Sequence, residues 1–171
     1  LVYRNKTSRA TLQELIRSSE LPRFVDVNIR QPHFDSDWIP ELLDRATWVK
    51  VNTHELAFLS GMSVRDRHDV RAAVDRLRSR FGDATYFVTS GSQGAYAITQ
   101  DEIEFAEACR PTRLVDSVGA GDAFSAATLG GILRSDPMAE TLRRAVGFAS
   151  RICGIEGATS EDRSLYQKVY S

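Results

Sequence analysis

The order of apolar segments along the chain is the feature that most restricts its fold. Runs rich in β-branched and aromatic residues predict short buried strands at 24–28, 47–51 and 85–89. Segments with apolar residues three and four positions apart predict helices at 8–18, 52–61 and 66–80. Strands that alternate with helices form a largely parallel sheet covered by helices on both faces. Because ligands of such sheets bind beyond the carboxyl ends of the strands, we expect the chemistry in the turns that follow them.

The remaining segments predict helices and one pair of antiparallel strands. Residues 95–98 and 103–106 are typical of a meander that follows a glycine turn. A helix that carries Trp38 is expected to be capped by Asp35 or Ser36. A nearly all-apolar stretch predicts a buried helix, because a helix that is apolar all round is usually enclosed. That helix is expected from about 121, and two more at about 138–152 and near 162–169.

Composition and charge exclude several classes of function. The 22 basic and 23 acidic residues give a net charge of −1, so no positive excess exists to bind nucleic acid or a membrane surface. No run approaches the length of a membrane-spanning helix. The first residues lack the pattern of a signal peptide, which favours a cytoplasmic protein, and the missing initiator Met indicates a fragment or a processed chain. Cys109 and Cys153 are interpreted as buried thiols of a reducing compartment.

The turn at residues 116–122, Asp-Ser-Val-Gly-Ala-Gly-Asp, is the strongest candidate for chemistry. Its glycines allow a tight turn and the close approach of a ligand. The amides of Gly119, Ala120 and Gly121 would point outward at the start of a helix, which favours an anion. Asp122 would face the same anion, and a general base is one reason to place a carboxylate there. The alternative is an acid that is favoured in a first helical turn by the helix dipole alone.

The sequence argues against a dinucleotide-binding fingerprint and excludes a P-loop. Phe124 stands where a dinucleotide-binding fingerprint needs its third glycine, and its ring would prevent close packing of helix and strand. No Gly-Lys-Ser/Thr sequence exists for a P-loop, because the only lysines are Lys6, Lys50 and Lys168. Any nucleotide phosphates would therefore be held by backbone amides, arginine and metal.

The other strand ends are ambiguous by themselves. Asn52 and Glu55 are typical of a capping box at a helix start, which is the favoured interpretation, and the alternative is that they order the waters of Mg²⁺. The turn at 89–94 is explained by a simple hairpin, or by contact with phosphates. Asp26 and Arg30 could form a local ion pair.

Together these four segments resemble the ribokinase/PfkB carbohydrate kinase family. The turn at 116–122 is similar to the family's Asp-Thr-x-Gly-Ala-Gly-Asp signature, and 52–55 to its Asn-x-x-Glu segment. Residues 89–94 match its Thr-x-Gly-x-x-Gly turn, and 26–30 resemble the Asp-x-Asn-x-Arg of fructokinases and ketodeoxygluconate kinases. All four occur in the family's order and together cover essentially the whole chain, so the joint match is far more specific than any single motif.

Two departures from the family's pattern are small. Ser117 replaces the usual Thr and keeps a hydroxyl, whereas Val118 loses any side-chain contact that a Thr would make there. A larger departure is length. Only the C-terminal half of the family's pattern is matched, so residues 1–171 are expected to be the ATP-binding and catalytic-base part without the N-terminal half and its β lid.

The resemblance implies a fold and a set of site residues. The fold is an α/β, three-layer α/β/α ribokinase-like arrangement with a mainly parallel sheet, truncated at its N-terminal side. Asp122 is implied as the base, the amides of residues 119–121 as an anion hole, and Asn52 and Glu55 as holders of hydrated Mg²⁺. The residues implied to meet ATP or an acidic substrate are Thr89, Gly91, Gly94, Asn28 and Arg30. Gly157 and Ala158 are implied near the adenine, with Asp116 across a loop for a monovalent cation such as K⁺.

The implied activity is ATP-dependent phosphorylation of a sugar hydroxyl, with a fructose-like sugar favoured. The alternatives are 2-keto-3-deoxygluconate or a nucleoside as the acceptor, or a non-catalytic nucleotide-binding remnant. The implied partner is a small-molecule sugar, with no nucleic acid or membrane, and a homodimer is compatible with the full-length protein. The isolated fragment is expected to be inactive, because the groups that contact the sugar would lie in the absent half.

Overall fold

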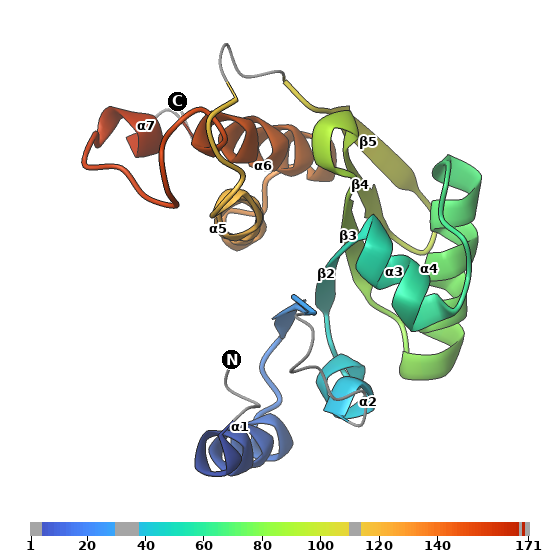
Figure 1. Cartoon of the computed structure of the whole chain (residues 1–171). Helices are drawn as coiled ribbons and strands as arrows, with labels where there is room; N and C mark the ends of the chain where they lie inside the picture. Colours follow the sequence, from blue (N-terminus) through green and yellow to red (C-terminus); the bar gives the residue numbers. More distant parts are fainter. Residues whose placement is uncertain (1–4, 30–37, 110–113, 168, 170–171) are drawn as a thin grey trace.

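The protein is described here as a computed structural model that covers residues 5–29, 38–109, 114–167 and 169. One sheet of five strands runs in the order β1-β2-β3-β4-β5 (Figure 1). The strands are β1 (Phe24–Asp26), β2 (Trp48–Asn52), β3 (Thr85–Thr89), β4 (Gly94–Ile98) and β5 (Ile103–Glu107). The first three are parallel, and β4 and β5 continue the sheet as an antiparallel meander. The strand positions predicted from the sequence are thus confirmed to within two residues at each end.

Helices cover both faces of this sheet, which confirms the predicted three-layer fold (Figure 1). On one face lie α3 (Thr53–Ser60) and α4 (Arg67–Phe81), and on the other lie α5 (Ala120–Leu133) and α6 (Met138–Ile152). The remaining helices are α1 (Lys6–Ser18), α2 (Ile39–Leu43) and the short α7 (Ser164–Gln167). A hydrogen bond of 2.6 Å from Gln13 to Glu41 joins α1 to α2.

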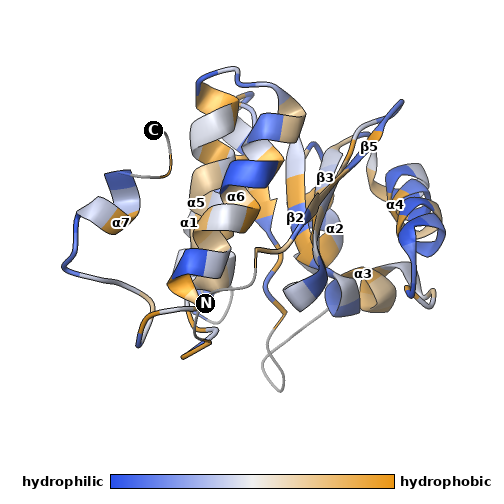
Figure 2. Ribbon diagram, turned by 90° about the horizontal axis from the view of Figure 1, so that it is seen from above, coloured by the Kyte–Doolittle hydropathy of each residue, from blue (hydrophilic) through white to orange (hydrophobic). Residues whose placement is uncertain are grey.

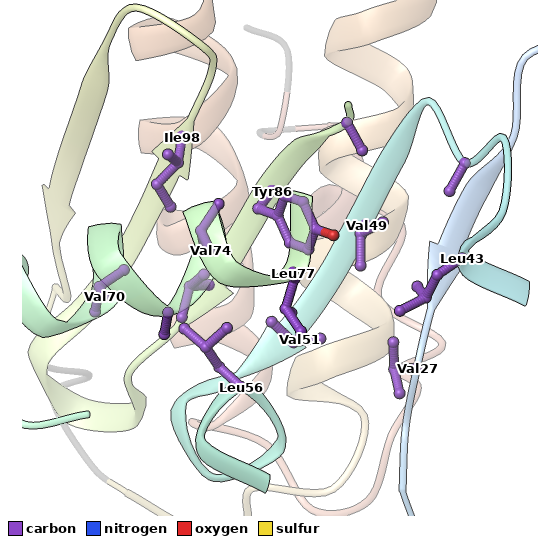
Figure 3. Close-up of a cluster of buried hydrophobic side chains, with 14 of the residues drawn as sticks. Val27, Leu43, Val49, Val51, Leu56, Val70, Val74, Leu77, Tyr86 and Ile98 are labelled. Atoms are coloured by element: carbon purple, nitrogen blue, oxygen red, sulfur yellow. The ribbon is translucent and has the colours of Figure 1, made fainter. Parts of the chain in front are cut away.

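Each face of the sheet has its own apolar core, and β3 contributes to both. Tyr86 and Val88 point toward α3 and α4, where they join Val51 and Leu77 (Figure 3). Phe87, one residue away, points to the opposite face, where Phe124 of α5 meets it edge-on with 6.4 Å between the ring centres. Side chains that alternate along a strand explain why the buried run in β3 serves two cores.

The helix α5 differs from its prediction, because only one side of it is enclosed. It packs on α6 and the sheet through residues such as Phe124 and Ala127, yet Leu133 is 83% exposed. The helix belongs to the outer layer, so its small apolar residues serve close packing rather than full burial. Figure 2 shows the contrast with α4, whose outer face is hydrophilic. None of the helices in the described ranges combines the length and the apolar character needed to cross a bilayer.

The outcome of three smaller predictions concerns a helix cap, the last helix and the two cysteines. Asp35 and Ser36 lie outside the described residues, and α2 has Trp38 at its N-cap with Pro40 in its first turn. The last helix covers only Ser164–Gln167. The prediction that both thiols are buried is wrong for Cys109, which is exposed just beyond the edge strand β5, whereas Cys153 is half-buried at the end of α6.

Candidate active site

Gly119 sets the shape of the turn that precedes α5. It is the N-cap residue of that helix and has a left-handed backbone, with φ +79°. A Cβ placed on it would lie 2.6 Å from Ala158 Cβ and 2.7 Å from Ala158 Cα. Both the backbone conformation and the space therefore require glycine at this position.

The segment that follows α6 holds this turn in place. The carbonyl oxygen of Cys153 accepts hydrogen bonds from the amides of Val115 at 2.9 Å and Asp116 at 3.3 Å. The Asp116 carboxylate in turn accepts the Val118 amide at 3.0 Å, which closes a local turn. The structure thus brings together the two loops in which Asp116, Gly157 and Ala158 were predicted to lie.

The start of α5 leaves backbone donors open. Within the described residues, the amides of Gly119, Gly121 and Asp122 have no hydrogen-bond partner. The Ala120 amide was also predicted to point outward toward an anion, but it donates a hydrogen bond of 3.3 Å to the Ser117 carbonyl oxygen. Since Gly119 has no side chain with which to cap the helix, these donors remain free for an anion.

Asp122 lies in the first turn of α5 with its side chain exposed. Among the described residues, none forms a hydrogen bond or an ion pair with its carboxylate. A free carboxylate beside open amide donors can accept a proton from a group that an anion site holds nearby.

Asn52 and Glu55 form the capping box that was one of their two predicted roles. Asn52 Oδ1 accepts the Glu55 amide, and Glu55 Oε2 accepts the Asn52 amide, both at 2.8 Å. The second carboxylate oxygen, Oε1, accepts the amide of Ile29 at 2.8 Å. Glu55 is 6% exposed, and all three side-chain oxygens already serve the fold. Each oxygen keeps a second lone pair that can accept a hydrogen bond from water, so these side chains do not suit direct ligation and are compatible only with a hydrated Mg²⁺.

The turn after β3 separates the predicted phosphate-binding residues. Thr89 ends β3 directly opposite Asn52 of β2. Gly91 is exposed with φ +54°, and nothing lies within 4 Å of the Cβ position. Gly94 is buried, and a Cβ there would come within 2.0 Å of the Ala106 carbonyl oxygen. The hairpin therefore explains Gly94, while Thr89 and Gly91 remain at the edge where ligands would bind.

Lys50 is the residue that the sequence analysis missed. Asp26 was predicted to pair with Arg30, which lies outside the described residues, and it contacts Lys50 Nζ at 3.1 and 3.2 Å. It also accepts a hydrogen bond of 2.8 Å from Ser125 Oγ on α5. The signal in the sequence was a single lysine in the middle of an otherwise apolar strand, because such charges are rarely buried without a partner. Asn28, the residue before Ile29, is exposed with φ +44°.

Comparison with protein families identifies this arrangement. The family model for pfkB family carbohydrate kinases matches residues 4–164. The chain belongs to the PfkB family. A fructokinase of Klebsiella pneumoniae is 34% identical over 131 residues, which cover 74% of this chain and 40% of that protein. The chain therefore spans less than half the length of this relative.

Solved structures of two kinases have the same fold. The ribokinase of Arabidopsis thaliana, solved with ribose and ATP, has a TM-score of 0.76 at 23% sequence identity. The match covers 94% of this chain and 51% of the ribokinase chain. The aminoimidazole riboside kinase of Salmonella enterica, solved with aminoimidazole riboside and an ATP analogue, has a TM-score of 0.76 at 26% sequence identity. The match covers 98% of this chain and 60% of the riboside kinase chain. The mostly parallel sheet and its two helical layers are thus those of the family.

Burial also affects one thiol beside the glycine turn. Desolvation raises the pKa of the Cys153 thiol, and the negative charge of Asp116 raises it further. A thiol held in its neutral form is a poor nucleophile, and the group of Cys153 that joins the two loops is its carbonyl oxygen. Among the described residues, no group of three or more His, Cys, Asp or Glu side chains could hold a metal ion.

Proposed function

We propose that the protein carrying this chain transfers a phosphoryl group from ATP to a sugar hydroxyl, with Asp122 as the general base. The observation that supports this most is the free, exposed carboxylate of Asp122 beside the open amides of Gly119 and Gly121. The fit to ATP rests on these orphaned donors, because phosphate oxygens are the groups that such donors bind.

In this proposal each residue has a separate task. Asp122 accepts the proton of the sugar hydroxyl as its oxygen attacks the terminal phosphorus of ATP, and ADP leaves with the bridging oxygen. The amides at the start of α5 stabilise the charge that develops on the transferring group. Asn52 and Glu55 hold the waters of Mg²⁺, an ion that neutralises phosphate charge. Thr89 and Gly91 meet the phosphates from the neighbouring strand end.

The remaining assignments rest on the family resemblance. Gly157 and Ala158 are placed near the adenine, and a cation such as K⁺ is placed by the resemblance in the loop with Asp116; Ala158 itself lies against Gly119, in the turn that follows Asp116. A fructose-like sugar is the favoured acceptor, supported by the fructokinase relative. A nucleoside is the second candidate, because a similar solved kinase carries aminoimidazole riboside. 2-Keto-3-deoxygluconate remains the third.

A coupled assay for ADP release on the full-length gene product tests the proposal. A panel of fructose, ribose, 2-keto-3-deoxygluconate and nucleosides is compared in the wild type, Asp122→Asn and Asp101→Asn. Asp101 is an exposed carboxylate in the β4–β5 turn, beside residues at the amino ends of the strands, and serves as the matched control. We expect one acceptor to be turned over by the wild type and by Asp101→Asn, and not by Asp122→Asn. No turnover of any acceptor by the wild type would refute kinase activity.

A second experiment tests the 171-residue chain alone. It carries the glycine turn and Asp122, but spans only 40% of the fructokinase relative. We expect weak Mg·ATP binding by calorimetry and no sugar phosphorylation. Turnover of fructose by this chain alone would show that the sugar-binding groups lie within it.

A further inference from the structure

Lys50 occupies an unusual place for a lysine. It lies at the centre of β2, and only 9% of its side chain is exposed. Burial of a charge is unfavourable unless the group is paired and hydrogen-bonded. A lysine kept in such a position needs a reason beyond the stability of the sheet, because an apolar residue of similar size would be at least as stable there.

The pairing of Lys50 is built into the sheet. Asp26 is its direct neighbour in the parallel pair β1–β2, so both side chains leave the sheet on the same face. The ammonium contacts both carboxylate oxygens of Asp26, and Ser125 Oγ on α5 donates to the carboxylate oxygen Oδ2. The ion pair therefore lies between the sheet and α5.

The position of the ammonium along α5 is the decisive observation. A Cβ on Gly121 would lie 3.2 Å from Lys50 Nζ, so the ammonium lies closely against the position where a side chain at 121 would begin. Gly121 is inside α5 and has no positive φ, so backbone conformation does not require glycine here. The ammonium thus stands beside the first turn of α5, whereas the carboxylate contacts Ser125, four residues further along the helix.

This arrangement orients the ion pair along α5. Four residues of α-helix correspond to about 6 Å, so the positive group is nearer the N-terminus and the negative group is further along. The ion pair is therefore a dipole in the same direction as the helix dipole, which is already positive at the N-terminus. In a half-buried setting its field is weakly screened.

We propose that Lys50 is a positioning residue for the anion site, which places a fixed positive charge behind Gly121 and is held there by Asp26. The inference rests on the proposed function, because it assumes that a phosphoryl group binds at the start of α5. It also accounts for the absence of a side chain at position 121, because a Cβ there would come within 3.2 Å of the ammonium.

Two substitutions separate this role from a purely structural one. Lys50→Met removes the charge, whereas Asp26→Asn keeps it and removes the neutralising partner. A structural clamp predicts that both variants lose affinity together, because both break the same pair. The proposed role predicts opposite changes. Affinity for inorganic phosphate and for a non-hydrolysable ATP analogue falls about tenfold in Lys50→Met, and is retained or increased in Asp26→Asn.

Calorimetry on the full-length gene product measures these affinities. Arg144→Met is the matched control, because it breaks a half-buried ion pair with Asp136, just beyond the other end of α5, and we expect it to leave affinity unchanged. Equal losses in Lys50→Met and Asp26→Asn would overturn the inference. If Lys50→Met does not fold, Lys50→Arg and Asp26→Asn decide: retained affinity in both supports the inference, and loss in Asp26→Asn overturns it.

Gly121→Ala provides an independent test, because its Cβ would press against the ammonium and shift it slightly. We expect weaker phosphate binding in the wild-type background and no further loss on top of Lys50→Met. An equal loss in both backgrounds would mean that the methyl group blocks the ligand directly, which contradicts the inference. If Lys50→Met and Asp26→Asn change phosphate affinity in opposite directions but the wild type turns over no sugar, the kinase proposal is refuted and the role of Lys50 is retained. If the wild type turns over a sugar and both variants lose phosphate affinity equally, the role of Lys50 is refuted and the kinase proposal is retained.

Discussion

Glu55 and Asp122 are both acidic residues in the first turn of a helix that begins in the candidate site, yet their surroundings are opposite. Glu55 is 6% exposed, and both of its carboxylate oxygens accept backbone amides. Asp122 is exposed, and the described residues offer its carboxylate no partner. The same sequence signal therefore marks a structural group in α3 and a free group in α5.

The residue at the N-cap explains this difference. Asn52 caps α3 with its own side chain, which satisfies an amide and leaves Glu55 to satisfy two others. Gly119 caps α5 without a side chain and leaves the first amides open. A closed helix start stabilises the fold, whereas an open one is available to a ligand.

The largest effect on stability is expected at Gly119. Gly119→Ala forces a Cβ against Ala158 and places alanine at φ +79°, so we expect a loss of about 2–4 kcal/mol in the free energy of unfolding. Gly157→Ala is the control, because Gly157 has a similar φ of +75° with nothing within 4 Å of its Cβ position. It should lose only about 1 kcal/mol. Urea denaturation measures both, and equal losses would show that the contact with Ala158 does not matter.

A smaller loss is expected at Glu55. Glu55→Gln keeps the shape and weakens the hydrogen bonds to the amides of Asn52 and Ile29, so about 1–2 kcal/mol should be lost. Glu14, an exposed acid in α1, provides the control Glu14→Gln, with a change below about 0.5 kcal/mol. Thermal unfolding of the wild type, Glu55→Gln and Glu14→Gln measures the difference. Equal unfolding midpoints in all three would contradict the structural role of Glu55.

The smallest effect concerns the two cysteines. Burial and the charge of Asp116 raise the pKa of Cys153, so less of its thiol is ionised at pH 8 than in an exposed cysteine. Cys109 is exposed and should be alkylated first by iodoacetamide. Mass spectrometry of timed samples gives the order. Raising the pH should speed the reaction of Cys153, and Asp116→Asn should lower its pKa. Faster labelling of Cys153 than of Cys109 at pH 8 would contradict the placement of the loop.

The sequence predicted those features that depend on neighbouring residues. The strand at 85–89, the capping box at Asn52 and the glycine turn before α5 all follow from local patterns. The pairing of Asp26 could not be predicted in this way, because Lys50 and Ser125 lie 24 and 99 residues away along the chain. The exposure of Leu133 depends likewise on which helices the chain places beside α5.

The most direct test of the account measures turnover and stability together in Asp122→Asn and Glu55→Gln of the full-length gene product. If Asp122 is a free base, Asp122→Asn should lower kcat on the order of 10²–10⁴-fold while its free energy of unfolding changes by less than about 1 kcal/mol. Glu55→Gln should show the larger loss of stability of the two. Near-normal kcat in Asp122→Asn, with a loss of stability equal to that of Glu55→Gln, would show that Asp122 is only a helix-start residue.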